Sequence, residues 1–299
     1  MRRPTVGAAA RVALIAPGGP LNGEDEVRRA EDNARALGWQ PVRGPHVLSR
    51  NGYLAGSDGD RLADLNAALT DDEVDAVWCL RGGYGAMRIL DNIDYAALRR
   101  RPKAIIGYSD ATALHAAIST RCEVVSYHGP TARAELTEFS RLSLQRAVHG
   151  EDSGGVAADA STLRSGRARG RLVGGNLALL SALAGTPYEP SYHEAILVLE
   201  DVNEAVYRID RMLTQLRLGG RLGQCRAVVF GHFTDVPTSA ADPSRRPQTL
   251  DDVLHEVVDA LAIPSIAGAP IGHVADQWTV PLGAIAELDA DTRTLRILE

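Results

Sequence analysis

A short apolar run ends at a serine in the segment "KAIIGYSDATALHAAI", which covers residues 103–118. The run stops at a glycine, Tyr108-Ser109-Asp110 follow, and a helical pattern begins at once. Ser109 could cap that helix, because serine is a favoured N-cap residue. The same corner could expose its hydroxyl as a nucleophile, with the backbone N–H of Asp110 and the helix N-terminus facing a developing oxyanion. The segment departs from the G-x-S-x-G nucleophile elbow at Ala111, and both interpretations stay open.

A serine nucleophile needs a general base, which is usually a histidine oriented by a carboxylate. Two of the eight histidines lie in suggestive segments, His232 in "GHFTD" and His273 in "GAPIGHVADQWTVPLG". His115 lies within an apolar helical segment and is interpreted as a packed residue. Spacing along the chain does not choose between His232 and His273.

Two carboxylates compete for the role of orienting the base. Glu200 ends the apolar strand "AILVLE", and Asp201 follows it directly. A helix that starts near Asn203 would place its positive end beside either carboxylate and favour the ionised form that a histidine partner requires. Either residue could instead be a cap of that helix, and on local grounds the two are equal candidates.

The glycine-rich stretch "RGGYGAMR", residues 81–88, follows another predicted strand. It matches neither of the two common phosphate-binding glycine patterns, so we interpret it as a turn that brings backbone close to a substrate. The N–H of Gly83 is then a candidate second oxyanion donor, and Arg81 and Tyr84 are candidate substrate contacts. Arg81 could equally pair with a structural carboxylate.

Other chemistry has less support in the sequence. Cys79 could be a nucleophile, but its apolar neighbours predict a buried structural thiol. The three cysteines form no CxxC pair, and the sequence contains neither H-E-x-x-H nor paired Cys/His spacing. We therefore expect no metal and no cofactor.

An alternating pattern of strands and helices must position these residues. Apolar runs predict strands that begin at Arg11, Val74 and Lys103, and helical periodicity follows each of them. Such alternation is typical of a parallel sheet covered on both faces, in which sites lie beyond the carboxyl ends of the strands. The glycines of residues 82–85 and Ser109 would share that edge.

The composition changes over residues 149–170, which are rich in Gly, Ser and Ala and show no clear period. We therefore predict an N-terminal α/β domain over residues 1–150, a linker over 151–169 and a mixed C-terminal domain over 170–299. The C-terminal part ends in a predicted hairpin over residues 278–298, with "DADT" as its turn.

The bulk composition narrows the class of protein. The 299 residues are 45% apolar and 23% charged, which is ordinary for a globular protein with a sizeable core. The net charge of −6 argues against a nucleic-acid-binding protein. The sequence has no apolar run long enough for a membrane-spanning helix, and its scattered cysteines suit a reducing compartment, which together predict a cytoplasmic protein without a membrane partner.

Several segments together resemble the LD-carboxypeptidase family of serine peptidases, which includes the muramoyltetrapeptide carboxypeptidases and the microcin-immunity peptidases. The matching stretches follow the family order: "RGGYGAMRIL", "IIGYSDATAL", "RLVGGNLALLSALAGTP", "LVLEDVNEAVYRIDRMLTQL", "VVFGHFTD" and "APIGHVADQWTVPLGAIAELD". The resemblance implies a flavodoxin-like or glutamine-amidotransferase-like N-terminal sheet, a mixed α+β C-terminal domain, and a site at their junction. One departure is "APGGP", in which Gly18 stands where a serine is expected after the proline.

The resemblance also implies roles for the candidate residues. Ser109 would be the nucleophile, Glu200 rather than Asp201 the orienting acid, and His273 rather than His232 the base. The implied reaction is hydrolysis of the amide between an L-centre and a terminal D-amino acid. In the carboxypeptidase branch this releases D-alanine from murein tetrapeptides during cell-wall recycling in the cytoplasm, and family members are commonly homodimers.

Two other functions stay open. A member of the immunity branch would cleave an aminoacyl-nucleotide antibiotic. It would need an aromatic side chain on which the nucleobase could stack, and Trp278, near His273, is a candidate. A non-catalytic peptide- or sugar-binding protein would be expected to lack a member of the triad, yet all three residues are present.

Overall fold

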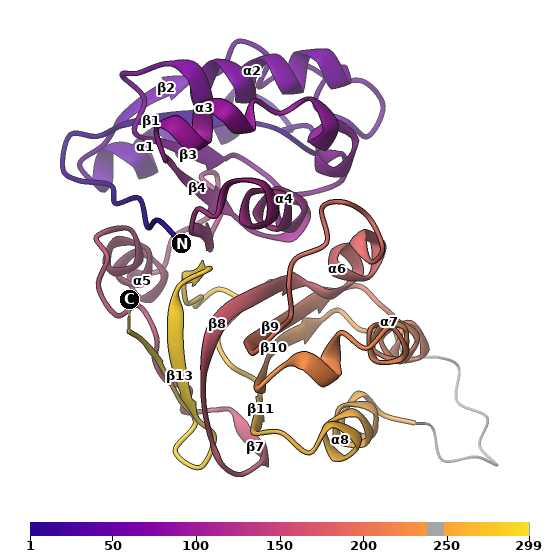
Figure 1. The fold of residues 1–299 in the computed structure, drawn as a ribbon. Coiled ribbons are helices and arrows are strands. Elements are labelled where there is room, and N and C mark those ends of the chain that lie inside the picture. Colours follow the sequence, from indigo (N-terminus) through magenta and orange to yellow (C-terminus); the bar gives the residue numbers. More distant parts are fainter. Residues whose placement is uncertain (238–247, 299) are drawn as a thin grey trace.

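The computed structural model describes residues 1–237 and 248–298, and its two β-sheets lie one above the other (Figure 1). The N-terminal sheet has six strands in the order β12-β5-β4-β3-β1-β2, of which β12, Val280–Leu282, comes from the end of the chain. Its parallel strands all come from the first half of the chain: β1 Arg11–Ile15, β2 Gln40–Arg43, β3 Ala76–Cys79, β4 Ala104–Gly107 and β5 Ser126–His128. The predicted parallel α/β domain is therefore confirmed.

The central strands β3 and β4 are buried at every residue, which is why they stand in the sequence as continuous apolar runs. The helices of this domain are α1 Glu24–Ala36, α2 Asp58–Thr70, α3 Tyr95–Arg100, α4 Thr112–Cys122 and α5 Glu138–Val148, with the 3₁₀ turns η1 Ala86–Asn92 and η2 Ser109–Ala111. Helix α1 buries Val27, Ala30 and Ala34 on one face, as their spacing predicts.

The C-terminal sheet is mixed and has eight strands in the order β6-β14-β13-β8-β9-β10-β11-β7. Its parallel centre consists of β8 Arg167–Asn176, β9 Ala195–Val202, β10 Ala227–Thr234 and β11 Ser265–Ala267. The antiparallel flanks are β6 Gly155–Val156, β7 Ser161–Arg164, β13 Ile285–Asp289 and β14 Thr294–Ile297. The helical elements are α6 Leu177–Leu183, α7 Val206–Leu218, α8 Leu250–Leu261 and the turn η3 Leu222–Gln224. This arrangement confirms the predicted mixed second domain.

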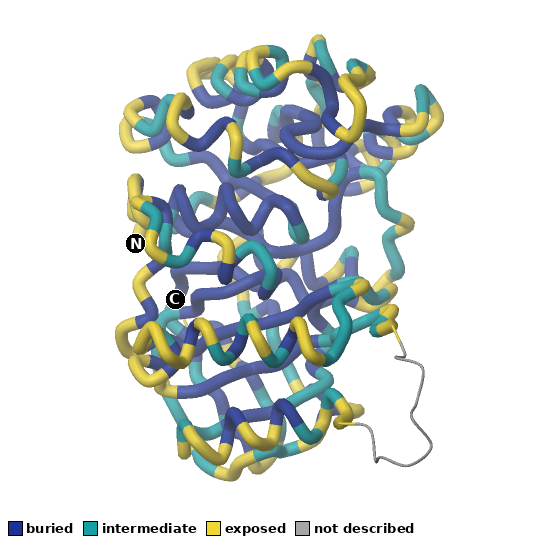
Figure 2. Tube along the Cα trace, turned by 90° about the vertical axis from the view of Figure 1, so that its right-hand side faces the viewer, coloured by how far each residue is buried: buried dark blue, intermediate teal, exposed yellow. Residues whose placement is uncertain are grey.

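Helix α4 lies between the two sheets and contacts η1 on one side and α6 and β8 on the other (Figure 1). Most of its residues are buried, including His115. A helix covered on two sides must be apolar nearly all round, and α4 accordingly lacks a polar stripe. Figure 2 shows the resulting distribution, with buried segments through the middle of the molecule and exposed residues on the outer helices and turns.

The structure differs from the predicted linker over residues 151–169, which contain β6, β7 and the start of β8. Strands β6 and β7 are the two edges of the C-terminal sheet. A short edge strand is paired on one side only and needs no apolar run, so its Gly- and Ser-rich sequence shows no strand period. The domain boundaries at residues 150 and 170 stay predictions.

The C-terminal hairpin is shorter than predicted. Strands β13 and β14 form it, and Asp289 Oδ1 accepts the backbone N–H groups of Asp291 and Thr292 at its turn. The preceding strand β12, Val280–Leu282, instead pairs antiparallel with β5 at the edge of the N-terminal sheet. The tail therefore ties the two domains together, directly after the loop that carries His273.

Candidate active site

Ser109 lies at the corner between β4 and α4, at the carboxyl edge of the N-terminal sheet, as predicted. Its φ angle is +62°, in the left-handed region that residues other than glycine seldom adopt. Backbone strain of this kind clusters at functional sites, and serine nucleophiles can be presented on strained strand-to-helix turns. The predicted N-cap role is wrong, because neither η2 nor α4 has a side-chain cap hydrogen bond.

Glycines allow two loops to approach the serine. A Cβ atom on Gly82 would lie 2.8 Å from the Cβ atom and 2.9 Å from the Oγ atom of Ser109. Gly83 has a φ angle of +96°, and a Cβ atom there would lie 2.9 Å from the Cα atom of Gly19. The N–H of Gly19 also donates to the carbonyl of Gly82 at 2.8 Å. The "RGGYG" stretch thus serves close backbone approach.

Asp110 holds this arrangement from the serine side. Its buried carboxylate accepts the backbone N–H of Ala86 at 2.9 Å. A Cβ atom on Gly18 would lie 2.4 Å from Asp110 Oδ2, so the glycine found where a serine was expected leaves room for this carboxylate. Burial raises the pKa of Asp110, whereas the N–H groups of Ala86 and Gly85 and the charge of Arg61 oppose the shift.

His273 and Glu200 are hydrogen-bonded, with 2.8 Å between His273 Nδ1 and Glu200 Oε2. Glu200 is fully buried near the end of β9, and His273 lies in the loop between β11 and β12 with its side chain 21% exposed. Gly272, at a φ angle of +111°, allows this approach, because a Cβ atom there would lie 2.8 Å from the Cβ atom of Glu200. With Nδ1 engaged, Nε2 is the ring nitrogen that can exchange a proton at the site.

Tyr108 joins the two halves of the site. Its ring centroid lies 4.8 Å from that of His273, and Tyr108 directly precedes Ser109. No hydrogen bond joins Ser109 to His273 within the described residues, and such bonds in unliganded enzymes are often long and tighten when substrate binds. Tyr108 had no predicted role, although its place next to Ser109 was an available signal.

Asp201, the rival of Glu200, has a different partner. It accepts the side-chain amide of Asn176 and the backbone N–H of Ala178, both at 2.9 Å, at the N-terminus of α6. Burial raises the pKa of Asp201 to about 6. One expectation was wrong for both carboxylates: the helix predicted from Asn203 begins only at Val206, so neither residue caps it.

The remaining chemical candidates are placed elsewhere. His232 lies on β10, its backbone N–H donates to the carbonyl of Ile271, and its ring pairs with no carboxylate among the described residues. Burial raises the pKa of Cys79 to about 12, so this thiol stays protonated and is a poor nucleophile at neutral pH. Over residues 1–237 and 248–298, no group of three or more His, Cys, Asp and Glu side chains could hold a metal ion.

The predicted substrate contacts lie beside the glycine loop. Arg81 Nη1 donates to the carbonyl of Pro20, and in the described part of the chain its guanidinium forms no ion pair with a carboxylate. Tyr84 is exposed, and its ring meets that of Tyr53 edge to face at 5.5 Å. Arg81 therefore retains N–H donors for an anionic ligand, and the predicted structural carboxylate partner is not found.

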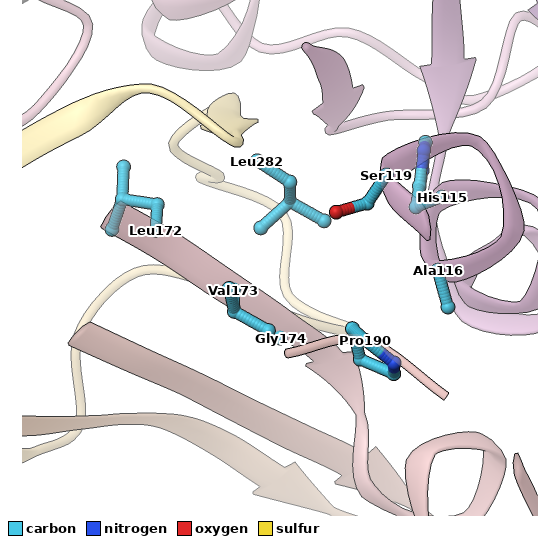
Figure 3. Close-up of a pocket in the computed structure, with 8 residues that line it drawn as sticks. All are labelled: His115, Ala116, Ser119, Leu172, Val173, Gly174, Pro190 and Leu282. Atoms are coloured by element: carbon cyan, nitrogen blue, oxygen red, sulfur yellow. The ribbon is translucent and has the colours of Figure 1, made fainter. Parts of the chain in front are cut away.

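A small pocket lies at the domain junction between α4 and β8, where the side chains of Ser119 and Leu282 face each other (Figure 3). Its volume is about 10 Å³, which is room for roughly one water molecule. His115 lines it and is bonded through Nε2 to the carbonyl of Gly107 at 2.8 Å and through Nδ1 to the hydroxyl of Ser126 at 2.9 Å. The pocket is too small for a peptide and is a packing gap between the domains.

Sequence profiles of a single family match most of the chain. The LD-carboxypeptidase N-terminal domain matches residues 12–129, and the LD-carboxypeptidase C-terminal domain matches residues 169–288. A putative carboxypeptidase of Streptomyces coelicolor is 42% identical over 302 residues, which covers 96% of this chain and 93% of that protein. The murein tetrapeptide carboxypeptidase of Pseudomonas aeruginosa is 34% identical over 300 residues, with 94% of each protein covered.

Solved structures share the two-domain fold. A muramoyltetrapeptide carboxypeptidase from Oxalobacter formigenes superposes with a TM-score of 0.85 at 30% identity, over 96% of this chain and 98% of its own. The microcin C7 self-immunity protein MccF superposes with a TM-score of 0.88 at 22% identity, over 100% and 98% of the two chains, which shows the fold alone. Since both domain profiles match in order and the curated relatives match over nearly their whole length, this chain belongs to the LD-carboxypeptidase family.

Proposed function

We propose that the chain is a serine-type LD-carboxypeptidase in which Ser109, His273 and Glu200 form a catalytic triad. The observation that carries this proposal is the 2.8 Å hydrogen bond between His273 Nδ1 and Glu200 Oε2. The ring of His273 also packs against the ring of Tyr108, the residue directly before Ser109. A buried carboxylate on Nδ1 orients the imidazole and stabilises the imidazolium that forms when Nε2 accepts a proton.

In the proposed mechanism, Ser109 Oγ attacks the carbonyl carbon of the scissile amide while its proton passes to His273 Nε2. The oxyanion accepts hydrogen bonds from the backbone N–H groups of Asp110 and Gly83. His273 then gives the proton to the leaving nitrogen, the D-amino acid departs, and an acyl ester on Ser109 remains. Water activated by His273 hydrolyses the ester and restores the free serine.

The proposed substrate is a murein tetrapeptide, from which cleavage of the last amide releases D-alanine. Two of the proteins to which the chain is similar carry names that refer to this substrate. A carboxypeptidase must recognise a free terminal carboxylate. A Cβ atom on Gly83, the proposed oxyanion donor, would lie 3.9 Å from Arg81 Nε, which supports Arg81 as the partner of that carboxylate. Tyr84, exposed on the same loop, would contact the peptide.

The immunity-type function is the second candidate, because the fold is shared with MccF. That function needs an exposed aromatic platform for a nucleobase, but Trp278, Trp39 and Trp78 are 4%, 3% and 0% exposed. Trp278 packs in the core of the C-terminal domain. Tyr53 and Tyr84 are exposed beside the glycine loop. Because a nucleobase could stack on these rings, the experiment below also includes a nucleotide substrate.

We further propose that the protein is a homodimer that acts in cell-wall recycling in the cytoplasm, with neither nucleic acid nor a membrane as partner. This part is supported by the family resemblance alone. None of the helices in the described ranges is both long and apolar enough to cross a membrane. Sedimentation equilibrium measures the assembly, and a monomer at micromolar concentration would contradict the dimer.

Mass spectrometry of a murein tetrapeptide incubated with the protein tests the main proposal. We expect loss of one alanine with the wild type and no loss with Ser109→Ala. An aminoacyl-nucleotide is incubated in parallel, and cleavage of that compound without cleavage of the tetrapeptide would favour the immunity-type function. A fluorophosphonate should label Ser109 of the wild type, and failure to label any serine would overturn the serine mechanism.

A further inference from the structure

Arg61 is a fully buried arginine on α2, with 0% of its side chain exposed. The sequence around it is that of an ordinary amphipathic helix, in which an arginine is expected on the solvent face. Burial of a guanidinium is costly unless its N–H groups are paired. Arg61 is paired through Nη1 and Nη2, whereas its Nε has no hydrogen-bond partner among the described residues. The partners of the two terminal nitrogens indicate why the residue is buried.

The partners of Arg61 are the two glycine loops that surround Ser109. Arg61 Nη1 donates to the carbonyl of Pro17 and, at 2.8 Å, to the carbonyl of Gly85. Nη2 donates to Asp58 in the first turn of the same helix. A Cβ atom on Gly85 would lie 2.7 Å from Arg61 Nη1, so the loop backbone lies directly against the guanidinium.

Asp110 holds the same loop from the opposite side. Its Oδ2 atom accepts the N–H of Ala86 at 2.9 Å, and the N–H of Gly85 opposes the rise in its pKa that burial causes. Two buried charges of opposite sign therefore fix one short loop, one from α2 and the other from the residue after Ser109. The same loop, residues 81–88, contains Gly83, the proposed second oxyanion donor.

We propose that Arg61 is a positioning residue that keeps the loop of Gly83 at the distance from Ser109 that the oxyanion requires. This inference rests on the proposed function of the site. A donor aimed at the oxyanion acts where charge develops in the transition state, so loss of Arg61 lowers kcat and leaves KM almost unchanged. A purely structural role would lower the melting temperature without this division between kcat and KM.

Arg88 provides a matched control. Its guanidinium pairs with the same Asp58 through three hydrogen bonds of 2.8 to 3.1 Å, but it is 45% exposed. Arg61→Met should lower kcat by about 10²- to 10³-fold, the cost of losing one oxyanion donor, while Arg88→Met should stay within about threefold of the wild type. Arg61→Lys, which can donate to one of the two carbonyls, should recover part of the loss.

The same variants are compared in their affinity for a peptide boronate, whose boron becomes tetrahedral at the position of the scissile carbon, and for the product peptide. We expect boronate binding to weaken in parallel with kcat and product binding to stay constant. All assays are performed at a temperature at which circular dichroism shows that each variant is folded. If Arg61→Met does not fold, Arg61→Lys alone is used to test the positioning role. Arg61 variants with wild-type kcat and boronate affinity, or with a loss confined to KM, would overturn the inference.

Failure of the proposed function gives a different result, since the wild type would then leave the tetrapeptide intact. In that case the rate at which a fluorophosphonate labels Ser109 replaces turnover, because its phosphoryl oxygen occupies the oxyanion position. Slower labelling of Arg61→Lys than of Arg88→Lys supports the positioning role. Equal labelling rates reject it.

Discussion

The two halves of the site are built in different ways. The serine corner is made by neighbouring segments of one sheet, in which the backbone turns through a φ angle of +62° at Ser109 and Gly82 packs directly against its side chain. The proposed base and its proposed orienting acid are side chains that are 73 residues apart, His273 in the loop before β12 and Glu200 on β9. Strained backbone therefore presents the serine, whereas a hydrogen-bonded pair of side chains presents the histidine.

Buried charge also has different partners in the two halves. On the serine side, Asp110 and Arg61 bond backbone groups of the glycine loops. On the base side, Glu200 bonds His273 through Oε2, and its other oxygen has no hydrogen-bond partner in the described part of the chain. We therefore expect substitutions on the serine side to act through geometry and those on the base side to act through charge.

Loss of the nucleophile or the base should have the largest effect. Ser109→Ala and His273→Ala are each expected to lower kcat by roughly 10⁴- to 10⁶-fold with little change in melting temperature. Because both residues act in one step, the double variant should lose little more than either single variant, and steady-state kinetics measures this. His232→Ala is the control and should keep most activity. An inactive His232→Ala, or additive losses in the double variant, would contradict the assignment.

Replacement of the orienting acid should have the next largest effect. Glu200→Gln is expected to lower kcat by about 10³- to 10⁴-fold, because an amide favours the wrong tautomer of His273 and cannot stabilise its charged form. Asp201→Asn should keep most activity and lose about 1 kcal/mol of stability, because it weakens the cap of α6. Kinetics and urea unfolding of both variants distinguish the two carboxylates, and the reverse pattern would exchange their roles.

Removal of the substrate carboxylate should have a smaller effect. Amidation of the terminal D-alanine eliminates a charge-assisted contact of about 1.5–3 kcal/mol, which corresponds to roughly 10- to 100-fold in kcat/KM. Arg81→Met should abolish the preference for the acid while changing turnover of the amide little. If the wild type hydrolyses the peptide with a free carboxylate and the amidated peptide equally fast, Arg81 does not recognise the carboxylate. That result would favour the immunity-type function.

The loss of stability in acid should report on two buried histidines, His115 and His128. Burial lowers the pKa of His115 to about 4 and that of His128 to about 3, against about 6.5 in an unfolded chain. Below about pH 6.5 the unfolded chain therefore binds more protons, and the free energy of unfolding falls as the pH decreases, by up to about 1.4 kcal/mol per pH unit for each histidine. Asp201 acts in the opposite direction between its raised pKa of about 6 and its ordinary value, because there the folded state binds more protons.

Urea unfolding between about pH 7 and pH 4.5 measures this slope. Both ring nitrogens of His128 lack a hydrogen-bond partner among the described residues, so His128→Phe removes a titrating group without breaking a bond. The variant should show a shallower loss of stability in acid. A slope equal to that of the wild type would show that His128 is not held neutral by burial.

The parts of the fold with a local signal could be predicted from the sequence alone. Continuous apolar runs located β3 and β4, and the spacing of Val27, Ala30 and Ala34 located α1. The corner at Ser109 followed from the point where such a run stops. Periodicity and turn chemistry depend on residues a few positions apart, so one sequence contains them in full. The preference for Glu200 and His273 over their rivals came from family resemblance, because spacing left both pairs open.

Only the tertiary structure decided features that join distant residues. The sequence predicts strand β12 as half of a hairpin, but β12 pairs with β5. Strands β6 and β7, which lie in the segment of residues 149–170 that is rich in Gly, Ser and Ala, become edge strands. Asp201 caps α6 because β8 and β9 lie side by side, with Asn176 opposite Glu200. Arg61 is buried because it is covered by two loops, one that follows β1 and one that follows β3. Register and burial are properties of assembled surfaces, and the spacing of residues along one chain does not contain them.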